Sequence, residues 1–140
     1  MIILDTNVLS EAMKPRPASE VVRWLDSRPE PELFLTSVTQ AEILYGIEIL
    51  ARGRRRTALE SAIEAIFEED FFGRILPFDT DAARVFPKIV ARRRASGRPI
   101  GQFDAQIAAI AHSRGAAVAT RNDADFENCG IAVLNPWTGR

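Results

Sequence analysis

The stretch Ile2-Ile3-Leu4-Asp5-Thr6-Asn7, residues 2–7, places an apolar run at the start of the chain and an acid directly after it. A short apolar run of this kind is typical of a buried strand. Residues 7–13 have the spacing of a short helix that stops before Pro15. The sequence therefore predicts a strand that leads into a helix, with Asp5 at the carboxyl end of the strand.

The alternation of strand and helix patterns continues to the end of the chain. Further strands are predicted at 33–36, 75–78, 116–120 and 131–134, and helices at 19–27, 39–51, 55–67, 80–95 and 103–113. Strands separated by helices require right-handed crossovers and a parallel sheet that is covered on both faces. We expect an α/β fold, a three-layer α/β/α sandwich whose central, mainly parallel sheet has about five strands.

Length and composition limit the kind of protein. The 140 residues are 46% apolar and 26% charged, with a net charge of −1, which fits one globular domain spanning 1–140 and excludes a disordered chain. Cys129 is the single cysteine, and neither an export signal nor a membrane-spanning stretch is evident. A cytoplasmic protein is the expectation.

Acidic residues recur where a parallel sheet would gather them. Two groups follow predicted strands and two acids open predicted helices: Asp5, the cluster Asn122, Asp123 and Asp125, then Glu42 and Asp104. Ligands of such sheets bind outside the carboxyl ends of the strands. Carboxylates that converge there repel one another unless a counter-ion is bound, and an oxygen-rich site of this kind suits Mg²⁺, with Mn²⁺ as a possible substitute.

Each acid also has a structural interpretation. Thr39-x-x-Glu42 matches a capping box, in which Glu42 returns to the start of its own helix. Asp104 follows the ordinary preference for acids in a first helical turn. Asp5 and Asp125 could each serve as helix caps. The joint placement of the acids, rather than any one of them, is what favours a metal site.

Basic residues form two clusters, and nearly all of them are arginines. The clusters are Arg52, Arg54, Arg55 and Arg56, then Arg92, Arg93, Arg94 and Arg98. An arginine fork matches a phosphate group, so both clusters are candidate contacts for a phosphate backbone. The alternative is that they are solvated ends of helices near the C-termini, where positive charge complements the helix dipole.

Other single residues carry weaker hypotheses. His112, the sole histidine, is expected to be packed or exposed rather than catalytic. Arg121 either meets a substrate phosphate or pairs with Asp123 or Asp125. Trp24 and Trp137 are expected in a core or an interface.

The motifs together resemble a known family. They are Ile3-Leu4-Asp5-Thr6-Asn7-Val8-Leu9-Ser10-Glu11, Thr39-x-Ala41-Glu42-Ile43-x-x-Gly46, Phe103-Asp104-Ala105-x-Ile107-Ala108-Ala109, and Ala119-Thr120-Arg121-Asn122-x-x-Asp125-Phe126. In this order and spacing they look like the PIN-domain ribonuclease toxins of the VapC/FitB type, which belong to type II toxin–antitoxin systems. The resemblance extends from the first strand to Asn135-Pro136-Trp137.

The resemblance implies a Mg²⁺-dependent endoribonuclease that hydrolyses RNA phosphodiester bonds. The acids that hold the metal correspond to Asp5, Glu42 and Asp104. The fourth position falls at Asn122, where other members carry Asp; a neutral oxygen of Asn122, or a carboxylate of Asp123 or Asp125, completes the site. Thr6 and Arg121 are candidates for contacts with a carboxylate or with substrate phosphate.

The resemblance also implies partners. Toxins of this type are expressed with a small antitoxin protein that inserts a segment into the acidic site, and they typically form homodimers. A toxin–antitoxin complex that binds operator DNA through the antitoxin is a further possibility.

One alternative keeps the fold without the activity. The chain is then a PIN-like binding or regulatory module with an incomplete metal site, an interpretation that Asn122 keeps open. A phospho-acceptor receiver domain is excluded because Lys14 and Lys88, the only lysines, fit neither position that it requires. A haloacid-dehalogenase phosphatase would begin with Asp-x-Asp, whereas this chain has Asp5-Thr6-Asn7.

Overall fold

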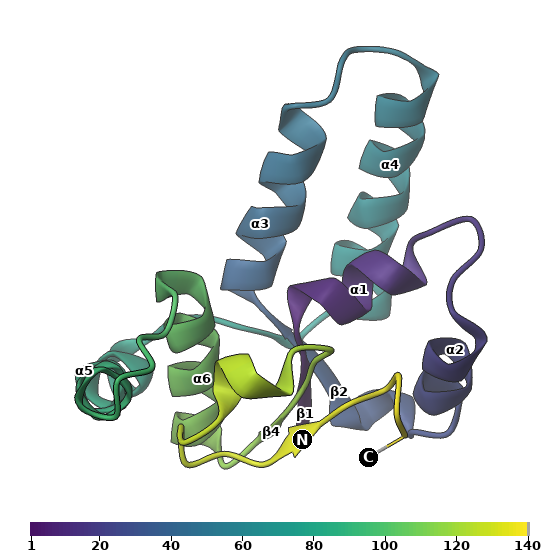
Figure 1. Ribbon diagram of the computed structural model, residues 1–140. Coiled ribbons are helices and arrows are strands. Elements are labelled where there is room, and N and C mark those ends of the chain that lie inside the picture. Colours follow the sequence, from purple (N-terminus) through teal and green to yellow (C-terminus); the bar gives the residue numbers. More distant parts are fainter. Residues whose placement is uncertain (140) are drawn as a thin grey trace.

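The fold is built on one parallel sheet, seen in a computed structural model that describes residues 1–139. Its five strands lie in the order β3-β2-β1-β4-β5 (Figure 1). Their bounds are β1 Ile2–Leu4, β2 Leu33–Thr36, β3 Ile75–Leu76, β4 Ala117–Ala119 and β5 Val133–Leu134. Every pair of neighbours is parallel, so the predicted α/β sandwich with its parallel sheet is confirmed.

Helices occupy all the predicted segments. Their bounds are α1 Thr6–Ala12, α2 Ser19–Asp26, α3 Ser37–Glu48, α4 Arg54–Ala65, α5 Thr80–Ala95 and α6 Gln102–Arg114, with the short 3-10 helices η1 Glu30–Glu32 and η3 Asp123–Phe126 and the π-helical turn η2 Ile66–Asp70. None of the helices within residues 1–139 is long and apolar enough to cross a membrane.

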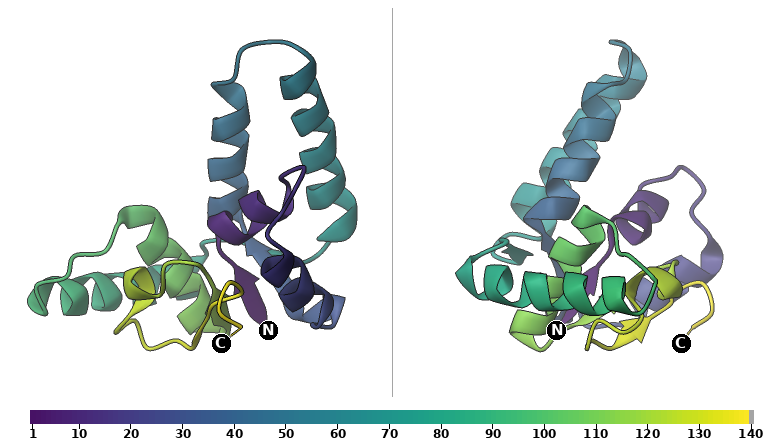
Figure 2. Two further views of the ribbon diagram at one scale, coloured as in Figure 1. Left: turned by 45° about the vertical axis from the view of Figure 1, so that its right-hand side comes forward. Right: turned by 60° about the vertical axis from the view of Figure 1, so that its left-hand side comes forward.

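Helices α3 and α4 form a hairpin that projects beyond the sheet (Figures 1 and 2). Arg54, Arg55 and Arg56 begin α4, so the expectation that this cluster lies near a helix C-terminus is wrong for them. Arg56 connects the two helices of the hairpin, because its guanidinium lies 3.0 Å from the carboxylate of Glu48 in α3 and 3.1 Å from that of Glu60 in α4.

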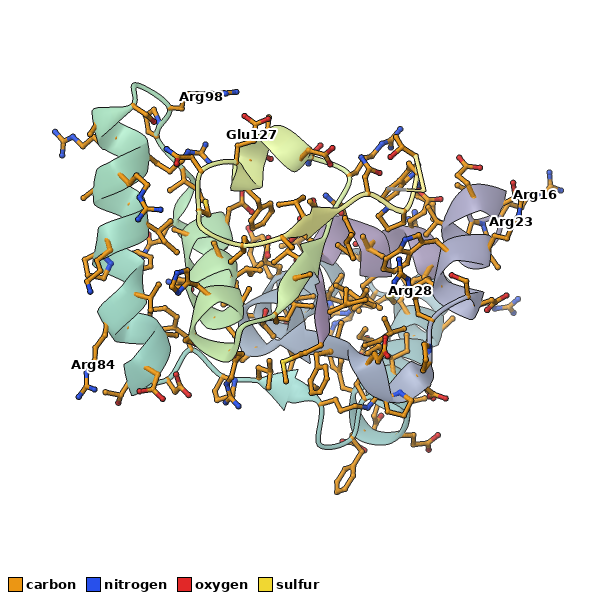
Figure 3. All side chains as sticks on the ribbon, turned by 90° about the horizontal axis from the view of Figure 1, so that it is seen from below. Arg16, Arg23, Arg28, Arg84, Arg98 and Glu127 are labelled. Atoms are coloured by element: carbon orange, nitrogen blue, oxygen red, sulfur yellow. The ribbon has the colours of Figure 1, made fainter. Side chains whose placement is uncertain are left out.

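The second arginine cluster divides into exposed and buried members. Arg92 and Arg94 of this cluster are exposed. They resemble arginines elsewhere in the chain, such as Arg16, Arg23 and Arg84, which extend from the surface (Figure 3). Arg93 is only 5% exposed. Its side chain is therefore part of the interior and cannot contact a phosphate backbone, contrary to the prediction for this cluster.

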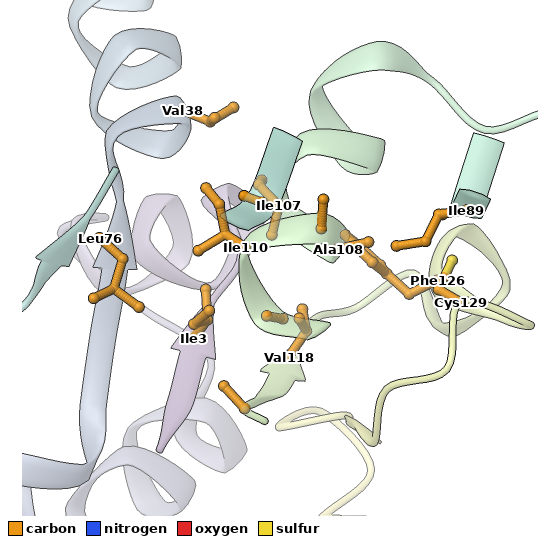
Figure 4. Packing of buried hydrophobic residues seen from close by; sticks show 14 residues of the cluster. Ile3, Val38, Leu76, Ile89, Ile107, Ala108, Ile110, Val118, Phe126 and Cys129 are labelled. Carbon is orange, nitrogen blue, oxygen red and sulfur yellow. The ribbon is translucent and has the colours of Figure 1, made fainter. Parts of the chain in front are cut away.

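Two apolar cores lie on the two faces of the sheet. Alternate strand residues point to opposite faces, so Ile3 packs with α5 and α6 while Ile2 and Leu4 pack with α1, α2 and α4. Figure 4 shows the first core, where Ile3 and Val118 meet Ile107 and Ile110 of α6. Burial on both faces fixes the sheet, and so fixes which residues emerge at its carboxyl edge.

The start of α3 differs from its prediction, whereas the start of α1 agrees with the cap role considered for Asp5. Thr36 caps α3, since its hydroxyl accepts from the N–H of Thr39 at 3.1 Å. The capping box of Thr39 with Glu42 is therefore wrong, and Glu42 lies in the second turn of α3. Asp5 caps α1 by accepting from the N–H of Thr6 at 2.8 Å.

Candidate functional site

A cleft of about 470 Å³ opens at the carboxyl edge of the sheet. Strands β1 and β4 are neighbours, so the segments that follow them meet there, together with α3 and α6. The cleft is lined by Asp5, Thr6, Asn7, Ser10, Glu11, Lys14, Glu42, Asp104, Arg121, Asn122, Asp125 and Trp137. We call Asp5, Glu42, Asp104 and Asp125 the acidic wall, and Lys14 and Arg121 the basic rim.

Asp5 lies at the bottom of the cleft and is 6% exposed. Its Oδ1 accepts from the N–H of Thr6 at 2.8 Å, and its Oδ2 accepts from the hydroxyl of Thr120 at 2.8 Å. Burial raises the pKa of Asp5, the Glu42 and Asp125 charges raise it further, and the two hydrogen bonds oppose the shift. Asp5 is thus a cap whose carboxylate is also in the cleft, so its two interpretations are compatible.

Thr120 organises the centre of the site, and it was not among the predicted site residues. Its fully buried hydroxyl donates to Asp5 and accepts from Asn7 Nδ2 at 3.2 Å and from the N–H of Asn122 at 3.1 Å. The segments after β1 and β4 are thereby joined through one oxygen. The only signal in the sequence was a threonine at the end of a predicted strand, and its partners Asp5 and Asn7 lie 115 and 113 residues away.

Thr6 holds Glu42 across the cleft. Its hydroxyl donates to Glu42 Oε1 at 2.8 Å and lies 3.0 Å from the hydroxyl of Thr39. A hydroxyl has one hydrogen, so Thr6 accepts from Thr39 while it donates to Glu42. Thr39, fully buried on α3, thus aligns the helix that carries Glu42 with the start of α1.

Asp104 lies in the first turn of α6, as predicted, and is half-buried. Its carboxylate is near the start of the helix, since a Cβ added at Gly101 would lie 3.8 Å from its Oδ2. Burial and the neighbouring charges of Asp5, Asp125 and Glu42 raise the pKa of Asp104 to about 6, with Arg93 acting in the opposite direction. The acids of the acidic wall therefore interact electrostatically.

The cluster Asn122, Asp123 and Asp125, which follows β4, lies only partly in the cleft. Asn122 and Asp125 line the cleft. Asp123 lies outside the lining, and its Oδ1 accepts from Asn135 Nδ2 at 3.0 Å. Asn122, not Asp125, is the residue at the start of η3, so the capping role considered for Asp125 is wrong.

The basic rim lines the same cleft as the acidic wall. The guanidinium carbon of Arg121 lies 5.1 Å from the centre of the Trp137 ring, and within residues 1–139 no ion pair joins it to Asp123 or Asp125. The predicted pairing is therefore wrong. Lys14 Nζ lies 3.0 Å from Glu11 Oε1. Trp137 belongs to the second core, as expected, and also lines the cleft.

His112 lies away from the acidic wall. It is exposed near the other end of α6, beside Gly130 and Met1. The expectation that this histidine is not catalytic agrees with its position.

The donors of the acidic wall fit a hard divalent cation. They are carboxylate oxygens, which Mg²⁺ and Mn²⁺ prefer. Burial raises the pKa of Asp104, and repulsion by the other acids raises it further. A bound cation would remove that repulsion. Within residues 1–139 no three His, Cys, Asp or Glu side chains already close around one point, so the acids line the cleft without forming a finished cage.

Comparisons with known proteins agree with this arrangement. Residues 2–131 match the family described as PIN domain. The chain is 40% identical to VapC ribonuclease Y4jK of Sinorhizobium fredii over 98% of each chain, and 39% identical to toxin FitB of Neisseria gonorrhoeae over 98% of this chain and 99% of that protein. The structure of FitAB bound to an IR36 DNA fragment superposes with a TM-score of 0.93 at 39% identity, covering 98% and 96% of the two chains.

Proposed function

Because this chain belongs to the PIN domain family, we propose that it is a metal-dependent endoribonuclease and the toxin of a type II toxin–antitoxin pair. The observation that carries the proposal is the acidic wall, whose members come from four separate segments and line one cleft. The names of the similar proteins, a VapC ribonuclease and a FitB toxin, support RNA as the substrate and toxicity as the role.

Asp5 and Asp104 would hold Mg²⁺ directly, Glu42 would bind it or orient the attacking water, and Asp125 would supply the fourth carboxylate. When bound, the cation stabilises the charge that develops on the phosphoryl oxygens. Asp125 supports the enzyme over the alternative of a binding module, because it gives the cleft a carboxylate where Asn122 lacks one. Asn122 is left with a neutral oxygen for the substrate or the cation.

Glu42 is suited to orient the attacking water. The bond from Thr6 occupies Oε1, which leaves Oε2 to accept a hydrogen bond from that water. The only hydrogen of the Thr6 hydroxyl is used in this way, so Thr6 acts on substrate indirectly. Asp104 loses its proton as the pH rises through about 6 and so is ionised for metal binding at neutral pH.

The basic rim supplies contacts for the phosphate groups of RNA. Arg121 is exposed, and its guanidinium is held against the Trp137 ring. A guanidinium presents a rigid fork of donors to phosphate. Lys14 lines the same cleft and supplies a second cation. Such contacts would place the RNA backbone across the acidic wall.

A second groove supports an antitoxin as partner. It has a volume of about 710 Å³, is lined mainly by apolar residues of α1, α3 and α4, and shares Thr6, Ser10, Lys14 and Glu42 with the cleft. An apolar antitoxin segment in this groove would lead directly into the cleft, where a cationic side chain would meet the acidic wall. The similar FitAB structure contains bound DNA, which supports operator binding by the complex.

A homodimer is the assembly that we propose. Leu44 and Tyr45 of α3, Ile49 directly after it, and Phe103 of α6 are large and exposed. Exposed apolar side chains of this kind favour association. The RNA substrate would place the protein in the cytoplasm.

RNA cleavage by purified protein tests the proposal. We expect cleavage with Mg²⁺, none after chelation by EDTA, and recovery when Mg²⁺ is added in excess. Asp5→Asn should fold and fail to cleave. Chelator-resistant cleavage, or an Asp5→Asn variant as fast as wild type, would contradict the assignment.

A further inference from the structure

Arg93 of α5 is a buried cation outside the cleft. Its side chain is 5% exposed, and among residues 1–139 no carboxylate lies within ion-pair distance of it. A buried charge without a carboxylate partner is costly unless its donors are fully used. Here the partners are main-chain oxygen atoms.

The guanidinium joins two segments that are far apart in sequence. Its Nε donates to the carbonyl oxygen of Arg98 at 2.7 Å, and its Nη1 donates to those of Asp125 at 2.8 Å and Glu127 at 3.0 Å. These bonds to a charged donor are stronger than those between neutral groups. One side chain therefore fixes both the loop after α5 and the turn η3.

Each of these segments carries one acid of the acidic wall. The loop, which is bonded to Arg93 at the carbonyl of Arg98, runs to Gly101, the cap of α6. Asp104 is in the first turn of that helix. The turn is held at the carbonyl of Asp125 itself. Arg93 is thus bonded to the residue that carries one carboxylate and to the loop that delivers the other.

Neighbouring contacts strengthen the same junction. Arg98 and Glu127 form an ion pair of 2.8 Å at the surface (Figure 3). The N–H of Arg98 donates to the carbonyl of Arg93 at 3.0 Å. The loop and the turn are connected at the surface by one arginine and in the interior by another.

We propose that Arg93 is a positioning residue that sets the separation of the Asp104 and Asp125 carboxylates and thereby the affinity of the cleft for a divalent cation. This inference rests on the proposed function, and assigns a role in it to a residue that touches neither metal nor RNA. Residues that orient metal ligands typically contribute about 10- to 100-fold to affinity.

Direct binding of Mn²⁺, followed by electron paramagnetic resonance of the free ion, tests the inference without RNA. We expect the dissociation constant of Arg93→Met to rise about 10- to 100-fold. Arg93→Lys keeps the charge but replaces the fork with one nitrogen, which cannot span the same carbonyls, so its constant should also rise, by less. Arg94→Met, an exposed neighbour on the same helix, is the matched control and should bind as wild type.

Thermal melting of each variant separates positioning from folding. If Arg93→Met does not fold, Arg93→Lys carries the test. A folded Arg93→Lys variant with a lowered melting temperature but unchanged Mn²⁺ affinity would show that Arg93 only stabilises the fold. An Arg93→Lys variant that melts as wild type and binds Mn²⁺ with the wild-type dissociation constant would also overturn the inference, since a positive charge without the fork would then be enough to position the carboxylates. If wild type neither binds Mn²⁺ nor cleaves RNA, it is the proposed function that fails.

Discussion

The acidic wall and the basic rim line one cleft but are held in place differently. Asp5 and Glu42 are each held by a threonine hydroxyl at 2.8 Å, and the threonines are fixed by further hydrogen bonds. Lys14 and Arg121 are exposed, the first paired with Glu11 and the second resting on Trp137. Asp5 and Glu42 are thus held by groups of the folded interior, whereas Lys14 and Arg121 are attached to its surface; Asp104 is half-buried and Asp125 is exposed.

This difference separates two kinds of contribution. Preorganised carboxylates are placed for a metal before substrate arrives, so changing them should affect metal binding and kcat. Exposed cations adapt to the substrate and attract it at a distance, so changing them should affect KM and the response to salt. Variants on both sides of the cleft test that division, beginning with the largest expected effect.

Two acids near one another in sequence give the strongest contrast. Asp125→Asn removes a carboxylate that lines the cleft, whereas Asp123→Asn removes one that accepts from Asn135 outside it. Because loss of a group that orients a ligand costs up to about 100-fold, loss of a ligand should cost more than about 100-fold in kcat. Asp123→Asn should cleave nearly as well as wild type. Equal losses in steady-state cleavage assays would remove the distinction between the two acids.

The threonine support of Glu42 should have the next largest effect. Thr6→Val preserves shape but removes the hydrogen donated to Glu42 Oε1, so kcat should fall about 10- to 100-fold. Thr6→Ser keeps the hydroxyl and should recover most of the rate. A Thr6→Val variant with a normal kcat and a raised KM would place Thr6 with the basic rim instead.

Arg121→Gln should weaken substrate binding more than turnover. Loss of one charge-assisted hydrogen bond raises KM on the order of tenfold, and the slope of log affinity against log salt should decrease by about one. Arg84→Gln, on the exposed face of α5 (Figure 3), is the control and should change neither. The measurement is RNA cleavage over a range of salt concentrations, and an unchanged slope would argue against a phosphate contact.

The smallest effect concerns stability. The pKa of Asp104 rises from an ordinary 3.8 to about 6 on folding, so the metal-free folded state holds an extra proton between those values. Stability is greatest below pH 3.8 as far as this group is concerned, and is lost as the pH rises through about 6. After discounting for partial exposure, the change is on the order of 1 kcal/mol.

Asp104→Asn removes this titration. The metal-free variant should melt about 3 °C above wild type at pH 7.5, about half as far above it at pH 5, and close to wild type below pH 3.8, where Asp104 is protonated in both states. Differential scanning calorimetry in EDTA provides the measurement. If the melting temperature of wild type rises between pH 5 and pH 7.5, and that of Asp104→Asn does not, then folding does not raise the pKa of Asp104.

Local sequence was sufficient to predict the elements that carry the acids. The run before Asp5 is apolar enough to specify β1, and Asp104 lies in the first turn of a helix rich in alanine and isoleucine that is buried along most of its length. Alternation of these patterns then implies a parallel sheet, whose carboxyl edge gathers the residues that come directly after its strands. The predicted strands and helices therefore agree with the structure, whereas the predicted caps of α3 and η3 do not.

The local sequence could not decide which of several similar residues takes a given role. Thr36 and Thr39 both have the spacing of a helix cap, and Thr36 serves because β2 extends to it. The role of Thr120 depends on a bond to Asp5, 115 residues away. Its sequence neighbours contain no sign of that partner.

The sequence by itself determined the order of strands and helices, and so the edge of the sheet at which acids emerge, because apolar periodicity and chain connectivity are local properties. The tertiary structure alone decided that Asp125 rather than Asp123 lines the cleft, and that Arg93 is buried between two exposed arginines. Residues of the same type that are near one another in sequence have the same chemistry, so they are distinguished by the direction in which each side chain points. That direction is set by how the helix or turn packs against the rest of the molecule.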